Sequence, residues 1–144
     1  MNRMTAITLA GGVTALLAGC MHGNASTQTY HATLTAAQEV PPTTSGGTGT
    51  ATVTVDTAAK TVTWNVTYSG LTGPAGAAHI HGPAAPGSNA GVVINIGTGG
   101  LASPITGTAP ITDAQIADLA AGKDYINIHT AANKGGEIRG QLTP

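Results

Sequence analysis

The clearest pattern in the chain is an alternation of apolar and polar residues with a period of two. In residues 50–55 and 61–68, alanine, valine, tryptophan or tyrosine occupies every second position, with threonine or asparagine between them. Alternation in segments this rich in β-branched residues predicts half-buried β-strands, and the short connection at 56–60 predicts a β-hairpin. The side chains that we expect to face the core are Val62, Trp64 and Val66.

Further short segments predict additional strands, and one segment predicts a helix. Thr112 and Gln115 have the spacing of a capping box, and Gly122 suits a helix stop, so we expect a connecting helix of about ten residues there. The strands expected outside the hairpin are 29–36, the segment with His79 and His81, 92–96, 105–108, 124–130 and 137–142. About seven or eight strands with one short helix predict an all-β domain, either an antiparallel β-sandwich or a Greek-key barrel.

The N-terminus has the order of a secretory signal. Arg3 supplies a positive charge, residues 6–18 form a mostly apolar run, and small residues close it. We therefore assign 1–19 to a signal peptide. The sequence Leu17-Ala18-Gly19-Cys20 resembles a bacterial lipobox, which implies that a lipid is attached to Cys20. An ordinary signal peptide with a chance cysteine and an uncleaved anchor are the alternatives.

This N-terminus sets the expected domain organisation and location. Residues 20–28 are expected to be the lipidated cysteine and a flexible tether, and 29–144 a single domain. We expect an exported lipoprotein that its lipid anchors to a membrane, at the outer membrane, the periplasmic face or the cell surface. Met21, which is not an aspartate, favours the outer membrane by resemblance to enterobacterial sorting.

Composition and charge exclude several classes of function. The chain has 5 Lys and Arg residues against 6 Asp and Glu residues and no basic cluster, so nothing supports nucleic-acid binding. Cys20 is the only cysteine, which excludes an intramolecular disulfide. No nucleophile motif, phosphate-binding glycine loop or pair of catalytic carboxylates is present, and we therefore assign no catalytic residue.

Three histidines are the candidate chemistry. His79 and His81 lie two positions apart in an expected strand, so their side chains project from one face roughly 6.5 to 7 Å apart. His129 lies near the end of a later expected strand. Three imidazoles suit copper or zinc. The alternative is a buried hydrogen-bonded network in which the same histidines contact Asn127, Glu137 and Arg139, which act as a second shell or as an ion pair.

Five sequence blocks together resemble the CHRD domain, which is named for chordin and is also found in many bacterial secreted proteins. The blocks are Gln-Glu-Val-Pro-Pro at 38–42, Gly-Leu at 70–71, Ala-His-Ile-His-Gly-Pro-Ala at 78–84, Gly-Lys-Asp-Tyr-Ile-Asn-Ile-His-Thr at 122–130 and Gly-Gly-Glu-Ile-Arg-Gly-Gln-Leu at 135–142. The resemblance covers nearly all of 29–144. It implies little about activity, because bacterial CHRD domains are mostly without an assigned function.

A fainter resemblance concerns the histidines. A His-x-His strand, a later strand with a histidine and a return strand with an arginine are similar to copper/zinc superoxide dismutase, a Greek-key β-barrel. That resemblance implies copper ligands at His79, His81 and His129, and an arginine that attracts an anionic substrate at Arg139. The chain departs from that family because it lacks a cysteine pair and has no histidine in 82–91. His31 is a further candidate ligand. The expected fold is thus immunoglobulin-like or superoxide-dismutase-like.

Two functions follow from these observations. The favoured one is a lipid-anchored CHRD-domain protein of the cell envelope, a non-catalytic structural or binding module whose partner is an envelope or extracellular macromolecule. The alternative is a periplasmic or surface protein that binds copper or zinc through His79, His81 and His129. The two differ in whether the histidines bind a metal stoichiometrically.

Overall fold

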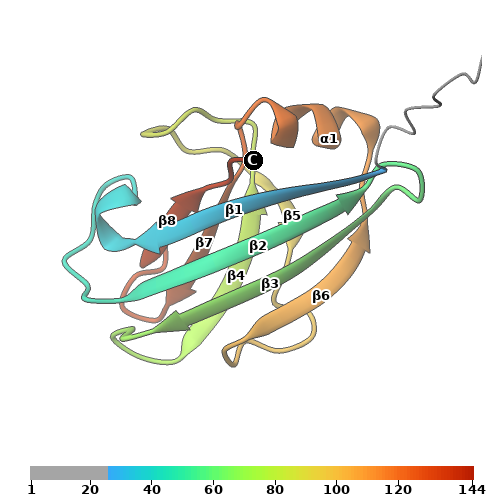
Figure 1. Cartoon of the computed structure of the whole chain (residues 1–144). Helices are drawn as coiled ribbons and strands as arrows, with labels where there is room; N and C mark the ends of the chain where they lie inside the picture. The colour runs from blue at the N-terminus through green and yellow to red at the C-terminus, as the bar shows by residue number, and fades with distance from the viewer. Residues whose placement is uncertain (1–25) are drawn as a thin grey trace, which may run out of the picture.

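The computed structural model describes residues 26–144, and within them eight antiparallel strands form one sheet that curls into a nearly closed barrel (Figure 1). The predictions for residues 1–25, including the signal peptide and the lipidation of Cys20, lie outside this range. The strands are β1 (Thr27–Thr35), β2 (Thr48–Asp56), β3 (Thr61–Ser69), β4 (Ala75–His81), β5 (Val92–Asn95), β6 (Ile105–Pro110), β7 (Tyr125–Thr130) and β8 (Ile138–Gln141).

The strand order across the sheet is β5-β4-β7-β8-β1-β2-β3-β6. β5 and β6 are therefore the two edges, and the pairing of β8 with β1 joins the two halves of the sheet. The predicted all-β antiparallel barrel with one short helix is confirmed. None of the helices in residues 26–144 has the length and apolar character needed to cross a bilayer.

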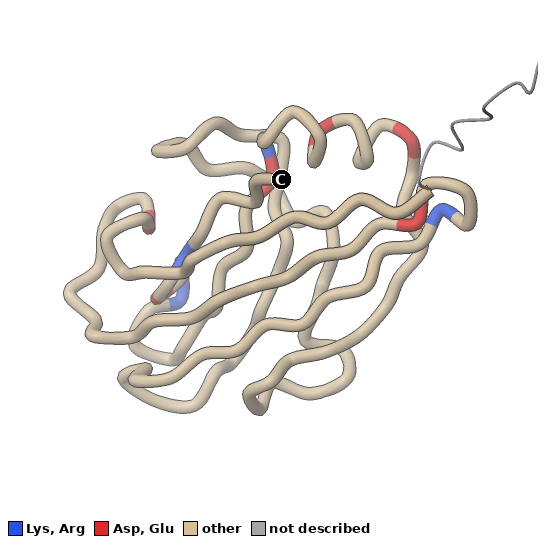
Figure 2. Tube along the Cα trace, viewed as in Figure 1, with Lys and Arg blue, Asp and Glu red and all other residues tan. Residues whose placement is uncertain are grey.

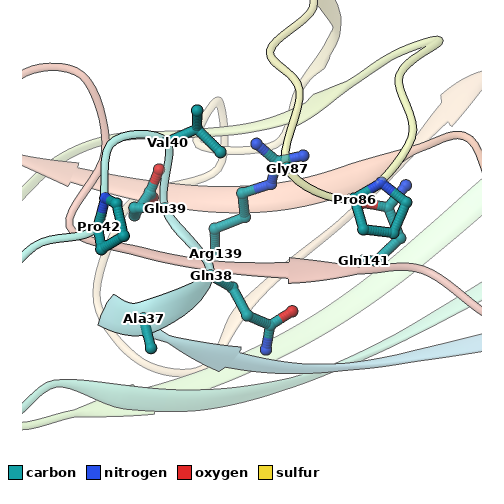
Figure 3. Close-up of a pocket in the computed structure, with 9 residues that line it drawn as sticks. All are labelled: Ala37, Gln38, Glu39, Val40, Pro42, Pro86, Gly87, Arg139 and Gln141. Carbon is teal, nitrogen blue, oxygen red and sulfur yellow. The ribbon is translucent and has the colours of Figure 1, made fainter.

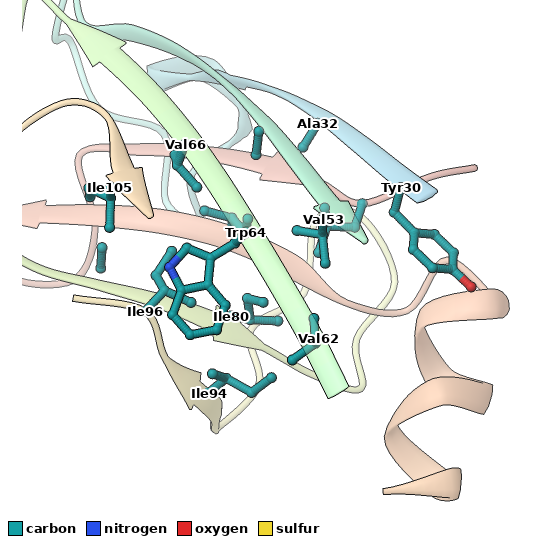
Figure 4. Close-up of a cluster of buried hydrophobic side chains, with 14 of the residues drawn as sticks. Tyr30, Ala32, Val53, Val62, Trp64, Val66, Ile80, Ile94, Ile96 and Ile105 are labelled. Carbon is teal, nitrogen blue, oxygen red and sulfur yellow. The ribbon is translucent and has the colours of Figure 1, made fainter. Parts of the chain in front are cut away.

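The hairpin of β2 and β3 shows why the sequence forms this sheet. Val53 pairs with Trp64 and Val55 with Val62, so the apolar residues of both strands lie on the same, inner face. Trp64 is 2% exposed and packs in the barrel interior among isoleucines that include Ile80, Ile94 and Ile96 (Figure 4). The predicted inward residues Val62, Trp64 and Val66 are all buried.

The outer face of β1, β2 and β3 has the opposite character. Threonine dominates the exposed positions of these strands, and Asp56 is their only charged residue. Figure 2 shows the few charges of the described chain near strand ends and loops, with long stretches of these three strands free of them. Most of the few charged residues of the described chain therefore lie outside these three strands.

The helix α1 (Asp113–Ala120) connects β6 to β7 and begins with the predicted capping box. The Thr112 side chain accepts from the Gln115 backbone N–H, and the Gln115 side chain accepts from the Thr112 backbone N–H. After the helix, Gly122 has a φ of 66°, a left-handed conformation that glycine adopts without strain. Leu119 is buried, while Ile116 is only partly buried.

The boundaries differ from prediction mainly at the chain ends. β1 begins at Thr27, inside the segment expected to be a tether, because residues 27–35 pair along their whole length with β2. β1 also ends earlier, at Thr35, where a single 3-10 turn η1 (Ala36–Gln38) follows. That turn was not predicted, because nothing local in Ala-Ala-Gln distinguishes it from strand or loop.

Candidate metal centre

The three candidate histidines lie on the outer face of two neighbouring strands. On β4, Ala78 and Ile80 are fully buried in the core, so the alternation of side chains sends His79 and His81 outward. On β7, His129 projects from the same outer face. The register of β4 with β7 places Ala77 opposite His129 and His79 opposite Asn127, which brings the histidines together.

The imidazole rings form a compact cluster. His79 Nδ1 lies 3.0 Å from His129 Nε2. The ring centroid of His79 is 5.3 Å from that of His81 and 4.9 Å from that of His129. One ring nitrogen from each histidine lies within 4.8 Å of the other two. His79, His81 and His129 therefore form one cluster that could hold a metal ion.

Backbone carbonyls determine which nitrogens carry protons. His129 Nδ1 lies 2.9 Å from the carbonyl oxygen of Lys134, and His81 Nδ1 lies 3.0 Å from that of Ala90. A carbonyl only accepts, so each of these Nδ1 atoms is the donor. In the neutral rings, Nε2 of His81 and Nε2 of His129 therefore keep free lone pairs. The His129 lone pair accepts from His79 Nδ1 when no metal is bound.

The local electrostatics favour the neutral form of two of the three histidine rings. Burial, reinforced by the neighbouring His129 and His81, lowers the pKa of His79. Burial also lowers the pKa of His81, although the hydrogen bond to Ala90 opposes the shift. A metal binds the unprotonated nitrogen of histidine, so a lowered pKa keeps both side chains ready to bind at neutral pH.

The cluster fits a transition metal. With bonds of 2.0–2.1 Å in a tetrahedral site, ligand nitrogens stand about 3.3 Å apart, close to the His79–His129 separation. His81 Nε2 is buried and has no hydrogen-bond partner in the described structure. A buried polar atom without a partner is unfavourable, and a bound metal relieves it. The three histidines can thus hold a metal ion.

The cluster is open to solvent on one side only. A groove of about 530 Å³ runs past it, and among the residues that line the groove are His79, His129 and Lys134. His81, which is 8% exposed, lies on the closed side beneath the loop that contains Ala90. A metal held by three side chains would therefore have one direction from which water or another ligand can reach it.

Two residues on the closed side form a stack with His81. The ring of Tyr125 lies parallel to His81 at an angle of 5° and a centroid distance of 5.0 Å. The Arg139 Cζ atom lies 3.4 Å from the centroid of the same tyrosine ring. No role for Tyr125 follows from the sequence, because the stacking depends on the pairing of β4 with β7, which places Tyr125 opposite His81.

Arg139 and Glu137 do not form an ion pair. The only ion pair within residues 26–144 joins Lys60 and Asp113. Arg139 is 1% exposed and donates from Nη1 to Asn89 Oδ1 and from Nη2 to the Ser88 carbonyl. A guanidinium fixed beneath the surface in this way serves to hold the 82–91 loop.

Glu137 is likewise buried, but its partners are neutral. Its carboxylate accepts hydrogen bonds from Ser45, from the backbone and hydroxyl of Thr72, from Thr130 and from Asn133. Burial alone would raise the pKa of Glu137, yet these hydrogen bonds lower it to about 2. Glu137 therefore fastens three loops together and is not a metal ligand.

Two further side chains complete the surroundings. Glu39 packs against Gly136 beside Asn127, and burial raises the pKa of Glu39 to about 7 although the charge of Arg139 opposes the rise. No role for Glu39 follows from the sequence, because Glu39 and Asn127 are far apart along the chain and only the fold brings them together.

His31 lies on β1 near Thr52 and does not belong to the histidine cluster.

The fold and the cluster define an antiparallel β-barrel domain with a three-histidine centre at its surface. Residues 30–142 match the family model of the CHRD domain, and the chain belongs to that family. No curated protein and no solved structure matched the chain. The family assignment thus confirms the resemblance of the five sequence blocks.

Proposed function

We propose that this CHRD-domain protein binds one copper ion through His79 Nδ1, His81 Nε2 and His129 Nε2. The observation that carries the proposal is the buried Nε2 atom of His81, which has no partner and lies within 4.8 Å of two other imidazole nitrogens. Within residues 26–144 no hydrogen bond of normal geometry satisfies that atom, whereas a bound metal ion would coordinate it. Binding through His79 Nδ1 requires its proton to move to Nε2, the other nitrogen of the same ring.

The donor set favours copper over the other divalent metals. The cluster contains only imidazole nitrogens, with no carboxylate that would suit magnesium, calcium or manganese. Among first-row divalent ions, Cu²⁺ binds such sites most tightly, and zinc is the next metal to test. The groove leaves a coordination position for a water molecule or an external ligand.

The test is a metal titration of the full chain carrying Cys20→Ser, which removes the only thiol. After treatment with a chelator, the protein is titrated with Cu²⁺ and with Zn²⁺ by calorimetry, in its original form and with His79→Ala, His81→Ala or His129→Ala. We expect one equivalent of copper in the starting protein and at least 100-fold weaker binding in each alanine variant.

A matched control separates this site from adventitious binding to surface histidines. His31 is exposed and stands outside the cluster, so His31→Ala should leave the copper stoichiometry and affinity unchanged. Circular dichroism of each variant establishes that it is folded. If the starting protein binds no copper, or if His31→Ala weakens binding as much as the cluster variants, the proposal is wrong.

We further propose that the domain is exported and anchored to the cell envelope by a lipid on Cys20. The support is the order of charge, apolar run and small residues before Cys20 in the sequence. Fractionation of cells that express the unaltered chain should place it with the membranes, and Cys20→Ser should release it. Membrane association that persists in the Cys20→Ser variant would contradict the lipid anchor.

A further inference from the structure

Arg139 is a buried cation without an anionic partner within ion-pair distance. Its side chain extends from β8 toward the loop that carries Gly87, beside a pocket of about 330 Å³ (Figure 3). The acceptors of its two hydrogen bonds, Asn89 Oδ1 and the Ser88 carbonyl, are both neutral. Within residues 26–144, no carboxylate lies within 4.0 Å of the guanidinium. Its charge is therefore not neutralised by an ion pair.

This charge lies directly behind one of the three ligands. Because β7 stands between β4 and β8, His81 and Arg139 approach the Tyr125 ring from opposite sides. Only the tyrosine ring separates the guanidinium from the imidazole. The stack also has a fixed geometry, since Tyr125 and His81 both contact Ala90 of the covering loop.

We propose that Arg139 sets the oxidation-state preference of the copper site by disfavouring Cu(II) relative to Cu(I). This inference rests on the proposed copper function. A fixed positive charge repels the doubly charged ion more than the singly charged one, while three neutral imidazoles bind both. Arg139 is thus a positioning residue for the loop and, through its charge, a determinant of which copper ion binds more tightly.

The expected size of the effect follows from Coulomb's law. At a separation of roughly 10 Å and an effective dielectric constant of about 20, one unit of charge difference changes a ratio of affinities roughly tenfold. The charge of Arg139 affects the ionisation of the Glu39 carboxyl group. Glu39 offsets part of the effect when ionised, so all variants are compared at one pH.

The experiment measures copper affinity in both oxidation states. The full chain with Cys20→Ser is titrated against bicinchoninate under ascorbate for Cu(I), and against nitrilotriacetate in air for Cu(II). Arg139→Gln should lower the ratio of the Cu(II) dissociation constant to the Cu(I) dissociation constant about tenfold. Arg139→Lys keeps the charge and loses the forked hydrogen bonds, so it should keep most of the original ratio.

A second variant keeps the test decisive if Arg139→Gln does not fold. Asn89→Asp places a carboxylate where the Asn89 side chain already accepts a hydrogen bond from Arg139 Nη1. The guanidinium is then neutralised without being removed, and the ratio should fall in the same direction. Lys123→Gln removes an exposed positive charge and is the control that should leave the ratio unchanged.

The outcomes separate this inference from the function on which it rests. Absence of copper binding in the starting protein would refute the proposed function. Copper binding with an unchanged ratio in Arg139→Gln and Asn89→Asp would leave the function standing and overturn the role of Arg139. Equal changes in Arg139→Gln and Arg139→Lys would also overturn it, because they would show that loop contacts, and not charge, determine the preference.

Discussion

Replacing Glu137 by glutamine tests how much of the barrel's stability depends on one buried carboxylate. The side chain is 0% exposed, and five donors from Ser45, Thr72, Thr130 and Asn133 converge on its two oxygens. Glutamine has nearly the same shape but offers an N–H₂ group where the carboxylate has its second acceptor. At least two of these donors would then face another donor and lose their partner.

Two arguments give the magnitude of the loss. The hydrogen bonds hold the pKa of Glu137 at about 2, against an ordinary value of 4.5, which corresponds to about 3 kcal/mol of stability. Independently, two hydrogen bonds to a charged group contribute about 1.5 kcal/mol each. Because the pKa is lowered in the folded state, this stability is fully present above pH 4.5 and is lost as the pH falls from there through about 2.

The assay is urea unfolding followed by the fluorescence of Trp64, the only tryptophan, at pH 7 and at pH 3. We expect Glu137→Gln to lower the free energy of unfolding by about 3 kcal/mol at pH 7 and by about half as much at pH 3. A loss below about 0.5 kcal/mol at pH 7 would refute the reasoning, since ordinary surface substitutions have effects of that size. An equal loss at both pH values would also refute it.

Glu39 is the matched control, because the chain has only these two glutamates and both are buried. Burial raises the pKa of Glu39 to about 7, so its ionised form destabilises the fold. That penalty is absent below pH 4.5 and complete above about pH 7. Glu39→Gln should therefore raise the free energy of unfolding at pH 8 by up to about 3 kcal/mol, opposite in sign to Glu137→Gln.

Three further substitutions test the surroundings of the site. Burial, with the charge of Asp118, raises the pKa of Asp124 to about 6, so Asp124→Asn should stabilise the protein by up to about 3 kcal/mol in urea unfolding at pH 7, and not at pH 3. Gly136 has a φ of 130°, and a Cβ there would collide with the Glu39 carboxylate; Gly136→Ala should lower the melting temperature, and an unchanged value would contradict this packing. Tyr125→Phe removes the hydroxyl that accepts from the Ala90 N–H and should cost about 1 kcal/mol in urea unfolding.

The part of the site that sequence predicts is the part determined by local alternation. His79 and His81 share a face because two positions separate them in a strand, and the same parity places His129 with Tyr125 and Asn127 on β7. The capping box at Thr112 is equally local, and it formed as predicted. These features need only the pattern of neighbouring residues.

The part that sequence does not predict depends on contacts between distant segments. The carbonyls of Ala90 and Lys134 fix the proton positions of two histidines, but a backbone carbonyl has no signature in a sequence. The pairing of Glu137 with Arg139 considered from the sequence is absent. Glu137 accepts hydrogen bonds from four neutral residues, Ser45, Thr72, Thr130 and Asn133, and Arg139 donates to the 82–91 loop. Loop conformation determines both the proton positions of the histidines and the partners of Glu137 and Arg139. The alternation of residues within strands does not predict loop conformation.

The position of the histidines outside the core indicates that folding of the barrel does not depend on a bound metal. The core consists of inward side chains such as Ile80 and Ile128, whereas His79, His81 and His129 stand on the opposite face of the same strands. The interior is therefore packed without any contribution from a metal, unlike small domains in which a metal replaces the core. Two members of the cluster, His81 and His129, are also held by hydrogen bonds to backbone carbonyls that exist before a metal binds. A centre built in this way is preorganised, so metal removal should empty it without unfolding the barrel.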